Sequence, residues 1–127
     1  MNRLSGILGC LAGLSAVVLG ALGAHALKEP LATAGTAEAW QTAVDYHMWH
    51  ALALLLCATL ASHSRKVRAA VTCFTIGIVL FSGSLYWLAL EGPRWLGPIT
   101  PLGGLCLIAG WIFLGAVFLL PKRTTPD

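Results

Sequence analysis

The stretch LSGILGCLAGLSAVVLGALGAHAL, residues 4–27, contains no aspartate, glutamate, lysine or arginine and consists mainly of leucine, alanine, valine and glycine. A helix needs about 20 consecutive apolar residues to cross the hydrocarbon core of a bilayer. No water is available in that core, and a helix satisfies its backbone hydrogen bonds within one segment. The stretch therefore predicts a first membrane-spanning helix.

Three further apolar stretches of comparable length follow, at residues 43–62, 69–90 and 99–120. Only 10% of the 127 residues are charged, whereas a soluble domain carries about 25%. The apolar residues show no alternation with polar ones that would indicate the strands of a membrane barrel. The sequence predicts an all-α fold in a single domain, residues 1–127, which is an integral membrane bundle of four transmembrane helices.

Two threonines mark the expected starts of helices. Thr36 follows Gly35 and is expected to cap the second helix, with Glu38 in the first turn, where a negative charge is favourable. Thr100 is expected to cap the fourth helix. Pro101 would then occupy the first helical position, where its missing N–H costs nothing.

The basic residues are divided unequally between the two ends of the predicted bundle. One end, with both termini and the second loop, carries Arg3, Arg65, Lys66, Arg68, Lys122 and Arg123, and the other carries Lys28 and Arg94. Because lysine and arginine concentrate on the cytoplasmic side, this division predicts that both termini and the second loop lie in the cytoplasm. An outer interfacial belt is expected from Trp40, Trp49, Trp87 and Trp95.

A cleaved signal peptide is the main alternative to a retained first helix. Arg3 precedes the apolar run, and Ala24-His25-Ala26 resembles the small-residue cleavage site of such peptides. However, the apolar run is longer than the about 7–15 residues usual in a signal peptide. The length favours a retained helix.

The first helix also carries a row of small residues at alternating steps of three and four. The row consists of Gly6, Gly9, Gly13, Ala16, Gly20 and Gly23. Such a seam lets another helix approach closely, and close packing drives helix association in lipid. The partner helix is either within the chain, in a second copy, or in another membrane protein. The alternative is that glycine and alanine are simply common in membrane helices.

A set of polar residues falls at the outer ends of the predicted helices. It consists of His25, Asp45, His47, His50, Ser82, Ser84, Tyr86, Glu91 and Thr100. Ionisable groups inside a membrane are expensive, so they indicate a candidate functional site. His47 and His50 share a helix face, whereas Asp45 points away from both. His50 and Ser84 have similar expected depths of about 9 and 10 Å, so a hydrogen bond between them is geometrically feasible.

Three interpretations of this polar set compete. The favoured one is structural, in which the side chains satisfy one another and fix which helices meet. The second is transport or proton handling, because histidine titrates near neutral pH; however, the cytoplasmic half offers no matching ionisable groups. The third is a metal or haem site formed by His25, His47 and His50, for which a lone His-x-x-His pattern is a weak signal.

The remaining motifs exclude rather than assign functions. The sequence contains no nucleophile elbow, phosphate loop or paired-carboxylate motif, so no enzymatic activity is expected. No cofactor is assigned, and the cysteines are interpreted as buried apolar residues: Cys10, Cys57, Cys73 and Cys106.

The net charge of +3 does not indicate a nucleic-acid partner, because the basic residues lie in short loops rather than on one stripe. The expected partner is the lipid bilayer.

Four segments of the chain resemble a known family. They are GALGAHAL at residues 20–27, YHMWHAL at residues 46–52, FSGSLY at residues 81–86 and GPITPLGG at residues 97–104. In this order they resemble the domain of unknown function 423 family, which includes the eukaryotic transmembrane-protein-256-like proteins. The resemblance implies a small multi-pass membrane protein, located in the cytoplasmic membrane in bacteria. It implies no activity.

Overall fold

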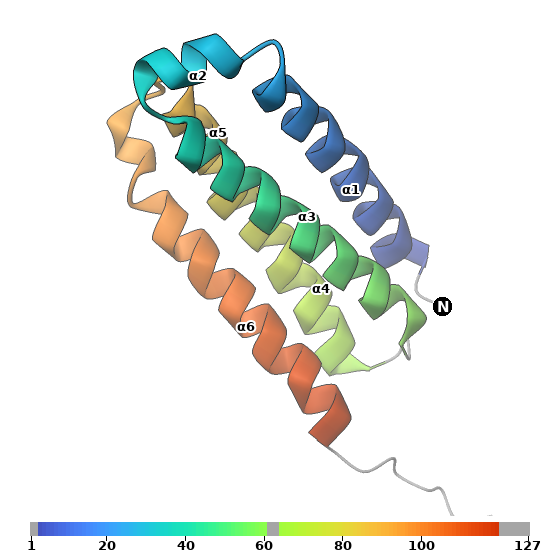
Figure 1. Ribbon diagram of the computed structural model, residues 1–127. Helices are drawn as coiled ribbons and strands as arrows, with labels where there is room; N and C mark the ends of the chain where they lie inside the picture. Colours follow the sequence, from blue (N-terminus) through green and yellow to red (C-terminus); the bar gives the residue numbers. More distant parts are fainter. Residues whose placement is uncertain (1–2, 61–63, 120–127) are drawn as a thin grey trace, which may run out of the picture.

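The computed structural model describes residues 3–60 and 64–119, and these residues form helices and turns without a β-strand. The elements are α1 (Arg3–Ala24), α2 (Lys28–Ala34), α3 (Ala37–Thr59), α4 (Arg65–Gly77), η1 (Ile78–Ser82), α5 (Gly83–Ala89), η2 (Arg94–Leu96) and α6 (Ile99–Leu119). Element η1 is a π-helical turn that joins α4 to α5 without a break. The long rods lie side by side, and the short α2 connects α1 to α3 at one end (Figure 1). The all-α prediction is confirmed.

Three segments within the described residues are long and apolar enough to cross a membrane. They are Arg3–Ala24, Arg65–Ala89 and Arg94–Leu119. Helix α3 has 23 residues, which is a sufficient length, but Asp45, His47 and His50 lower the hydropathy of its first half. Yet α3 has many buried positions, and α1, α4, η1 and α5 all contact it. The two histidines of this helix therefore face protein, with 7% and 4% of their surfaces exposed.

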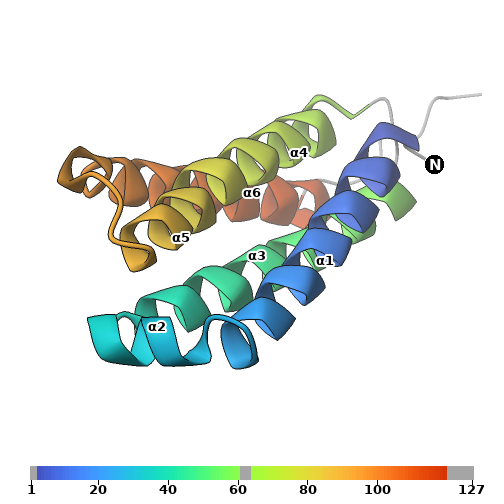
Figure 2. The same cartoon turned by 90° about the horizontal axis from the view of Figure 1, so that it is seen from above.

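The helices form two layers that meet at α3. Helix α1 packs mainly on α3, and α4 packs mainly on α6. Seen from above, α1, α2 and α3 lie on one side and α4, α5 and α6 on the other (Figure 2). Contacts from α3 to α4, η1 and α5 join the layers.

The small residues of α1 pack against α3 of the same chain. A Cβ atom added to these glycines would approach α3 residues in antiparallel order, from Gly6 against Ala58, through Gly9 against Leu55, Gly13 against Ala51 and Gly20 against Val44, to Gly23 against Trp40. Ala16 lies within this row and is fully buried. The partner that the sequence left open is therefore α3, which occupies the seam along its whole length.

A second close approach joins α4 and η1 to α6. A Cβ atom on Gly77 would overlap Leu107, and one on Gly110 would overlap the ring of Phe74. A Cβ on Gly103 would overlap the backbone at Phe81. These contacts border an apolar core formed by α3, α4, η1 and α6. It includes Ala53, Leu54, Cys57, Val67, Ala70, Val71, Phe74, Ile78, Leu107 and Leu114.

The helix starts differ from the predicted capping. Thr36 does precede α3, but its hydroxyl donates to the Ala89 carbonyl oxygen at 2.7 Å and caps no helix N–H. Thr100 lies inside α6, which begins at Ile99, and its Oγ1 is 2.6 Å from Ser84 Oγ. Both predicted caps are wrong because a neighbouring helix offers each hydroxyl a partner that the local sequence does not reveal.

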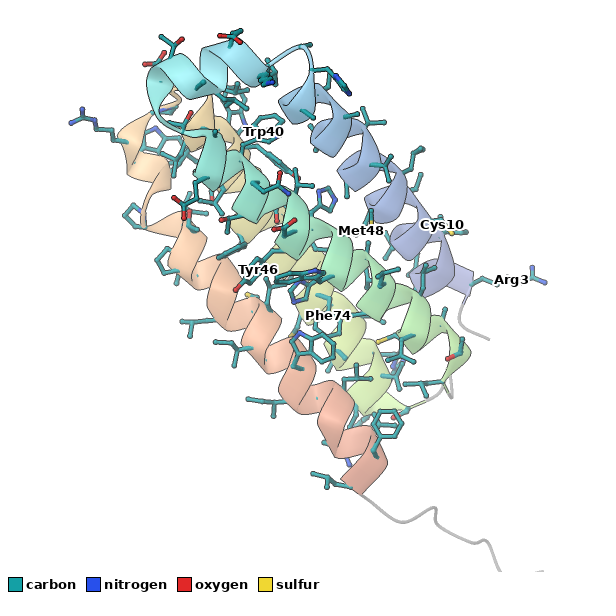
Figure 3. The ribbon with its side chains drawn as sticks, viewed as in Figure 1. Arg3, Cys10, Trp40, Tyr46, Met48 and Phe74 are labelled. Atoms are coloured by element: carbon teal, nitrogen blue, oxygen red, sulfur yellow. The ribbon has the colours of Figure 1, made fainter. Side chains whose placement is uncertain are left out.

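Three of the four tryptophans of the predicted belt lie on the surface of the bundle: Trp49, Trp87 and Trp95 are exposed. Trp40 is only 3% exposed, and its Nε1 donates to the Leu19 carbonyl oxygen at 3.0 Å. It lies between α3 and its neighbours rather than on the surface (Figure 3), so its assignment to the belt is wrong.

The tight seam predicts that alanine at Gly9 destabilises the fold. The added Cβ would lie 2.8 Å from Leu55 Cγ and 3.0 Å from its backbone nitrogen, so α1 and α3 must separate. We expect Gly9→Ala to lower the free energy of unfolding by about 1–3 kcal/mol, as in other overpacked cores. Thermal unfolding in detergent, followed by circular dichroism, measures the change.

Gly13→Ala is the matched control in the same helix. Its Cβ would lie 4.0 Å from Ala51 Cβ, which is an ordinary contact. Because alanine also favours a helix over glycine by up to about 1 kcal/mol, this variant should be neutral or more stable. Equal stabilities of the two variants would contradict the observed packing.

Candidate functional site

The two histidines of α3 enter separate hydrogen-bond networks. Residues three apart on a helix differ by about 60° in direction, and α3 contacts both α1 of its own layer and the opposite layer, so this difference is enough to separate their contacts. His47 faces Ser15 of α1 and Tyr86 of α5, whereas His50 faces Trp111 of α6. The predicted single polar cluster is therefore divided.

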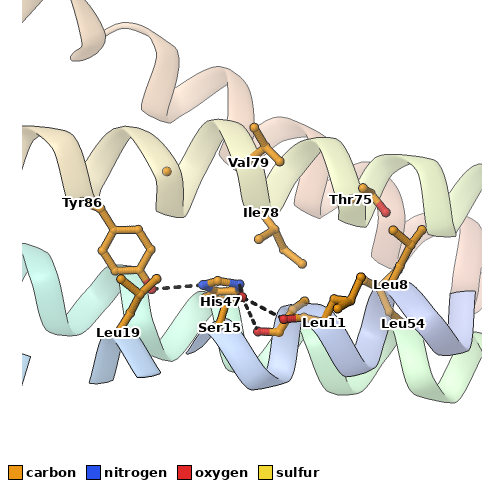
Figure 4. Close-up of a pocket in the computed structure, with 12 residues that line it drawn as sticks. Leu8, Leu11, Ser15, Leu19, His47, Leu54, Thr75, Ile78, Val79 and Tyr86 are labelled. Atoms are coloured by element: carbon orange, nitrogen blue, oxygen red, sulfur yellow. Dashed lines mark hydrogen bonds between the residues drawn. The ribbon is translucent and has the colours of Figure 1, made fainter. Parts of the chain in front are cut away.

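His47 links three helices through both of its ring nitrogens. Its Nε2 is 3.2 Å from Ser15 Oγ, and its Nδ1 is 3.1 Å from the Tyr86 hydroxyl. The Ser15 hydroxyl donates its one hydrogen to the carbonyl oxygens of Leu11 and Ala12, at 2.9 and 3.0 Å. With the Ser15 hydrogen on these carbonyls, the tautomer that fits has Nε2–H donating to Ser15 Oγ and the Tyr86 hydroxyl donating to Nδ1. Figure 4 shows the two contacts of the His47 ring.

This network borders a groove between α1 and the rod formed by α4, η1 and α5. The groove has a volume of about 420 Å³. Its lining consists of Leu8, Leu11, Ala12, Ser15, Leu19, His47, Leu54, Thr75, Ile78, Val79, Gly83 and Tyr86. Figure 4 shows the groove with His47 near Ser15 and Tyr86, and with leucines on both sides of them. The groove is thus apolar with one polar region.

His50 is fully engaged within the protein. Its Nδ1–H donates to the Tyr46 carbonyl oxygen at 2.6 Å, and its Nε2 accepts from Trp111 Nε1–H at 3.1 Å. Because a carbonyl only accepts and an indole N–H only donates, these two partners require a neutral ring with its hydrogen on Nδ1. The ring also packs beside Phe74, with centroids 5.6 Å apart.

Trp111 is the partner that the sequence analysis missed. Its indole N–H donates to His50 Nε2 and closes the His50 network. A partly buried indole N–H usually finds an acceptor, so the residue type alone indicated that Trp111 would bond to some group. The sequence did not indicate which acceptor, because that depends on how α6 packs.

Three other residues of the predicted polar set, Ser82, Ser84 and Asp45, form hydrogen bonds outside the two histidine networks. The Ser82 hydroxyl donates to the Ala43 carbonyl oxygen at 2.8 Å, which ties η1 to α3. Ser84 bonds to Thr100, so its feasible bond to His50 does not form, because Ser84 faces α6. Asp45 accepts from Gln41 of its own helix at 2.8 Å, as its direction away from the histidines predicts.

Two predicted members lie apart from the networks. His25 and Glu91 are exposed at the end of the bundle where α2 lies. His25, His47 and His50 are therefore not brought together. Within residues 3–60 and 64–119, no three histidine, cysteine or acidic side chains are grouped so that they could hold a metal ion.

The π-helical turn η1 determines which way α5 faces. A π turn contains one residue more than an α-helical turn, so it rotates the following helix by about 100° relative to an unbroken α-helix. Ser82, Ser84 and Tyr86 all lie at or after this turn; Ser82 and Tyr86 bond to α3, and Ser84 bonds to α6. The turn therefore positions the polar side chains, and such turns are frequent at functional sites.

Comparison with known proteins identifies relatives but no structural template. The family described as protein of unknown function DUF423 matches residues 19–104. The chain is 44% identical to the UPF0382 membrane protein YwdK of Bacillus subtilis over 85% of this chain and 89% of the relative. It is 37% identical to the UPF0382 inner membrane protein YgdD of Escherichia coli over 99% and 98%. No solved structure matches the chain.

The His50 network predicts that Trp111 contributes a measurable hydrogen bond. Trp111→Phe keeps an aromatic ring but leaves His50 Nε2 without its donor. Because hydrogen bonds between membrane helices average about 0.6 kcal/mol and reach about 1.7, we expect a loss of stability in that range. A double-mutant cycle with His50→Ala, measured by thermal unfolding, should return a similar coupling.

Trp95→Phe provides the control for this measurement, because Trp95 is 67% exposed at the end of the bundle. It should leave stability unchanged. A coupling energy of zero between His50 and Trp111 would rule out a contribution of this bond to the fold.

Proposed function

The chain belongs to the DUF423 family of membrane proteins, and from that premise we propose that it is a non-enzymatic accessory component of the cytoplasmic membrane. It crosses the membrane four times, with both termini in the cytoplasm. Its polar side chains fix the register of the helices. They perform no reaction.

The pairing of α1 with α3 supports a fourth span. The two helices pack in antiparallel order from Gly6 against Ala58 to Gly23 against Trp40, so they cover the same depth. Helix α3 has 23 residues, about 34 Å at 1.5 Å per residue, and the hydrocarbon core is about 30 Å thick. A bilayer crossed by α1 is therefore also crossed by α3.

The distribution of charge supports the proposed orientation. Arg3 lies at the end of the bundle opposite α2 (Figure 3), and Arg65 begins α4 after the loop at that same end. Lys28 and Arg94 begin α2 and η2 at the other end. Lys122 and Arg123 lie outside the described residues. The excess of basic residues at the end with Arg3 is the pattern of a cytoplasmic face.

The complete hydrogen bonding of the two histidines is the observation that supports the structural role. Every ring nitrogen of His47 and His50 has a hydrogen-bond partner within the chain. Across the described residues, no buried side-chain nitrogen or oxygen lacks a partner. A fully satisfied polar network in an apolar surrounding specifies which helices meet, because any other arrangement would strand a polar group in lipid.

The half of the bundle near Arg3 argues against a transport pathway. Its threonines bond to carbonyls of their own helices: Thr59 to Leu56, Thr72 to Arg68 and Thr75 to Val71. Between α3, α4 and α6 this half is filled by the apolar core, in which Leu54 and Phe74 are almost completely buried. A proton or ion route would need polar groups to continue through this core.

The structural role predicts that His50→Ala destabilises the protein without changing membrane permeability. The substitution removes two hydrogen bonds and a packed ring, so we expect a loss of about 1–3 kcal/mol in thermal unfolding. Vesicles containing the wild-type protein should dissipate an imposed pH gradient no faster than empty vesicles. A proton flux that His47→Ala abolishes would overturn the proposal in favour of proton handling.

The proposed topology predicts opposite accessibility at the two ends. In a background where the four cysteines are replaced by alanine, Glu29→Cys should react with a membrane-impermeant maleimide in intact cells. Arg65→Cys should react only after the membrane is opened. Both positions are exposed, so burial does not limit either reaction. Reaction of both in intact cells would place Glu29 and Arg65 on the same side of the membrane, and would so exclude a crossing by α3.

A further inference from the structure

The groove beside His47 has the dimensions of a ligand site and opens toward lipid. Helix α1 meets α3 along its length, but its contacts with α4, η1 and α5 are few, so the space between them stays open. The lining runs from Leu8 to Leu19 on α1, about 16 Å at 1.5 Å per residue. Its volume of about 420 Å³ lies within the range of small-molecule pockets.

The rim of the groove faces the surroundings of the bundle. Leu11 on one wall is 58% exposed, and Val79 on the other is 64% exposed. In a spanning bundle these side chains meet hydrocarbon, so the groove is open sideways to the acyl chains. A ligand therefore reaches it from within the bilayer, and most of that ligand is apolar.

The polar region of the groove determines the head group that fits. In the hydrogen-bond order given above, Tyr86 donates to His47, His47 donates to Ser15, and Ser15 donates to backbone carbonyls. The hydrogens of this chain are thus used, and the capacity that remains is the lone pairs of the two hydroxyl oxygens. A ligand that matches them must donate a hydrogen bond.

The lining also excludes charged head groups. None of the residues that line the groove is aspartate, glutamate, lysine or arginine. A carboxylate or phosphate in this position would be buried without a counter-ion, which costs far more than burying a neutral hydroxyl. An uncharged donor on a hydrocarbon chain is the chemistry that satisfies both the apolar walls and the free lone pairs.

We propose that the groove between α1 and the α4–η1–α5 rod binds an uncharged long-chain alcohol from the bilayer. The hydrocarbon chain lies along Leu8, Leu54 and Ile78, and the hydroxyl donates to Tyr86 or Ser15. This inference rests on the membrane embedding in the proposed function. It extends the accessory role from holding helices together to holding a lipid-derived ligand.

Photolabelling of the full chain in phosphatidylcholine nanodiscs tests the proposal. The probe is dodecanol carrying a diazirine in its chain, and mass spectrometry identifies the labelled residues. We expect saturable labelling of groove residues such as Leu11 and Val79. Unlabelled dodecanol should compete about threefold to tenfold better than its methyl ether, which lacks the donor. Dodecanoate should compete more weakly than the alcohol.

Two glycines provide a matched pair of variants. A Cβ at Gly83, which lines the groove, meets no atom within 4 Å, and the same is true of Gly115, which lies on the exposed side of α6. Gly83→Leu should therefore fold normally, fill the groove and lower saturable labelling by at least about tenfold. Gly115→Leu adds the same side chain elsewhere and should label like the wild type.

A dodecane probe with the same diazirine distinguishes a failure of the membrane embedding from a failure of the groove proposal. Labelling of Leu14 on α1 and Ile112 on α6 by this hydrocarbon reports that the exposed helix faces contact lipid. Its absence would overturn both the embedding and the groove proposal. If the hydrocarbon labels these faces but the alcohol does not saturate, or if Gly83→Leu labels like Gly115→Leu, the groove proposal alone is wrong.

Discussion

The absence of water inside a bilayer is the constraint on which the rest of this structure depends. A polar side chain in that environment must find its partner within the protein. Helix α3 carries both buried histidines, and α1, α4, η1 and α5 all contact it. The bundle therefore has the helix with the two buried histidines inside and its most apolar helices, α1 and α6, facing outward. This is the reverse of a soluble protein, where the most polar helix would face the solvent.

Small residues and hydrogen bonds have different roles in meeting that constraint. Glycines bring helix pairs close enough for extensive dispersion contacts. In lipid these contacts contribute to helix association, because no hydrophobic driving force acts between the helices. They act between α1 and α3 and between α4 and α6, so they build the two layers separately. Hydrogen bonds then join the layers through α3, by way of His47 to Tyr86, His50 to Trp111 and Ser82 to Ala43. The packing sets the distances and the hydrogen bonds select the register.

The sequence predicted what depends on local composition and failed where a contact depends on tertiary geometry. Apolar length located the long helices, and the small-residue pattern located the seam of α1. The seam's partner, the buried position of Trp40 and the bond between Trp111 and His50 followed from neighbours distant in the chain. The π turn at η1 left no compositional mark beyond Gly77 and Gly83 at its flanks, yet it sets the direction in which Ser84 and Tyr86 of α5 point. Helical periodicity alone placed His47 and His50 on one face, and only the position of α3 between two layers separated their partners.

The two histidines now differ in a way that their spacing did not suggest. His50 is enclosed by aromatic rings, and both of its partners have fixed hydrogen-bonding direction, since one is a carbonyl and the other an indole N–H. His47 is bonded by two hydroxyls, Ser15 and Tyr86, which can both donate and accept. A network that ends in hydroxyls retains lone pairs and can accommodate a further group, whereas the network of His50 cannot do so without breaking a bond. The groove lies beside His47, so this adaptable network also borders the open groove. The side of α3 that carries His47 is therefore the place where this bundle can accept a further hydrogen-bonding group.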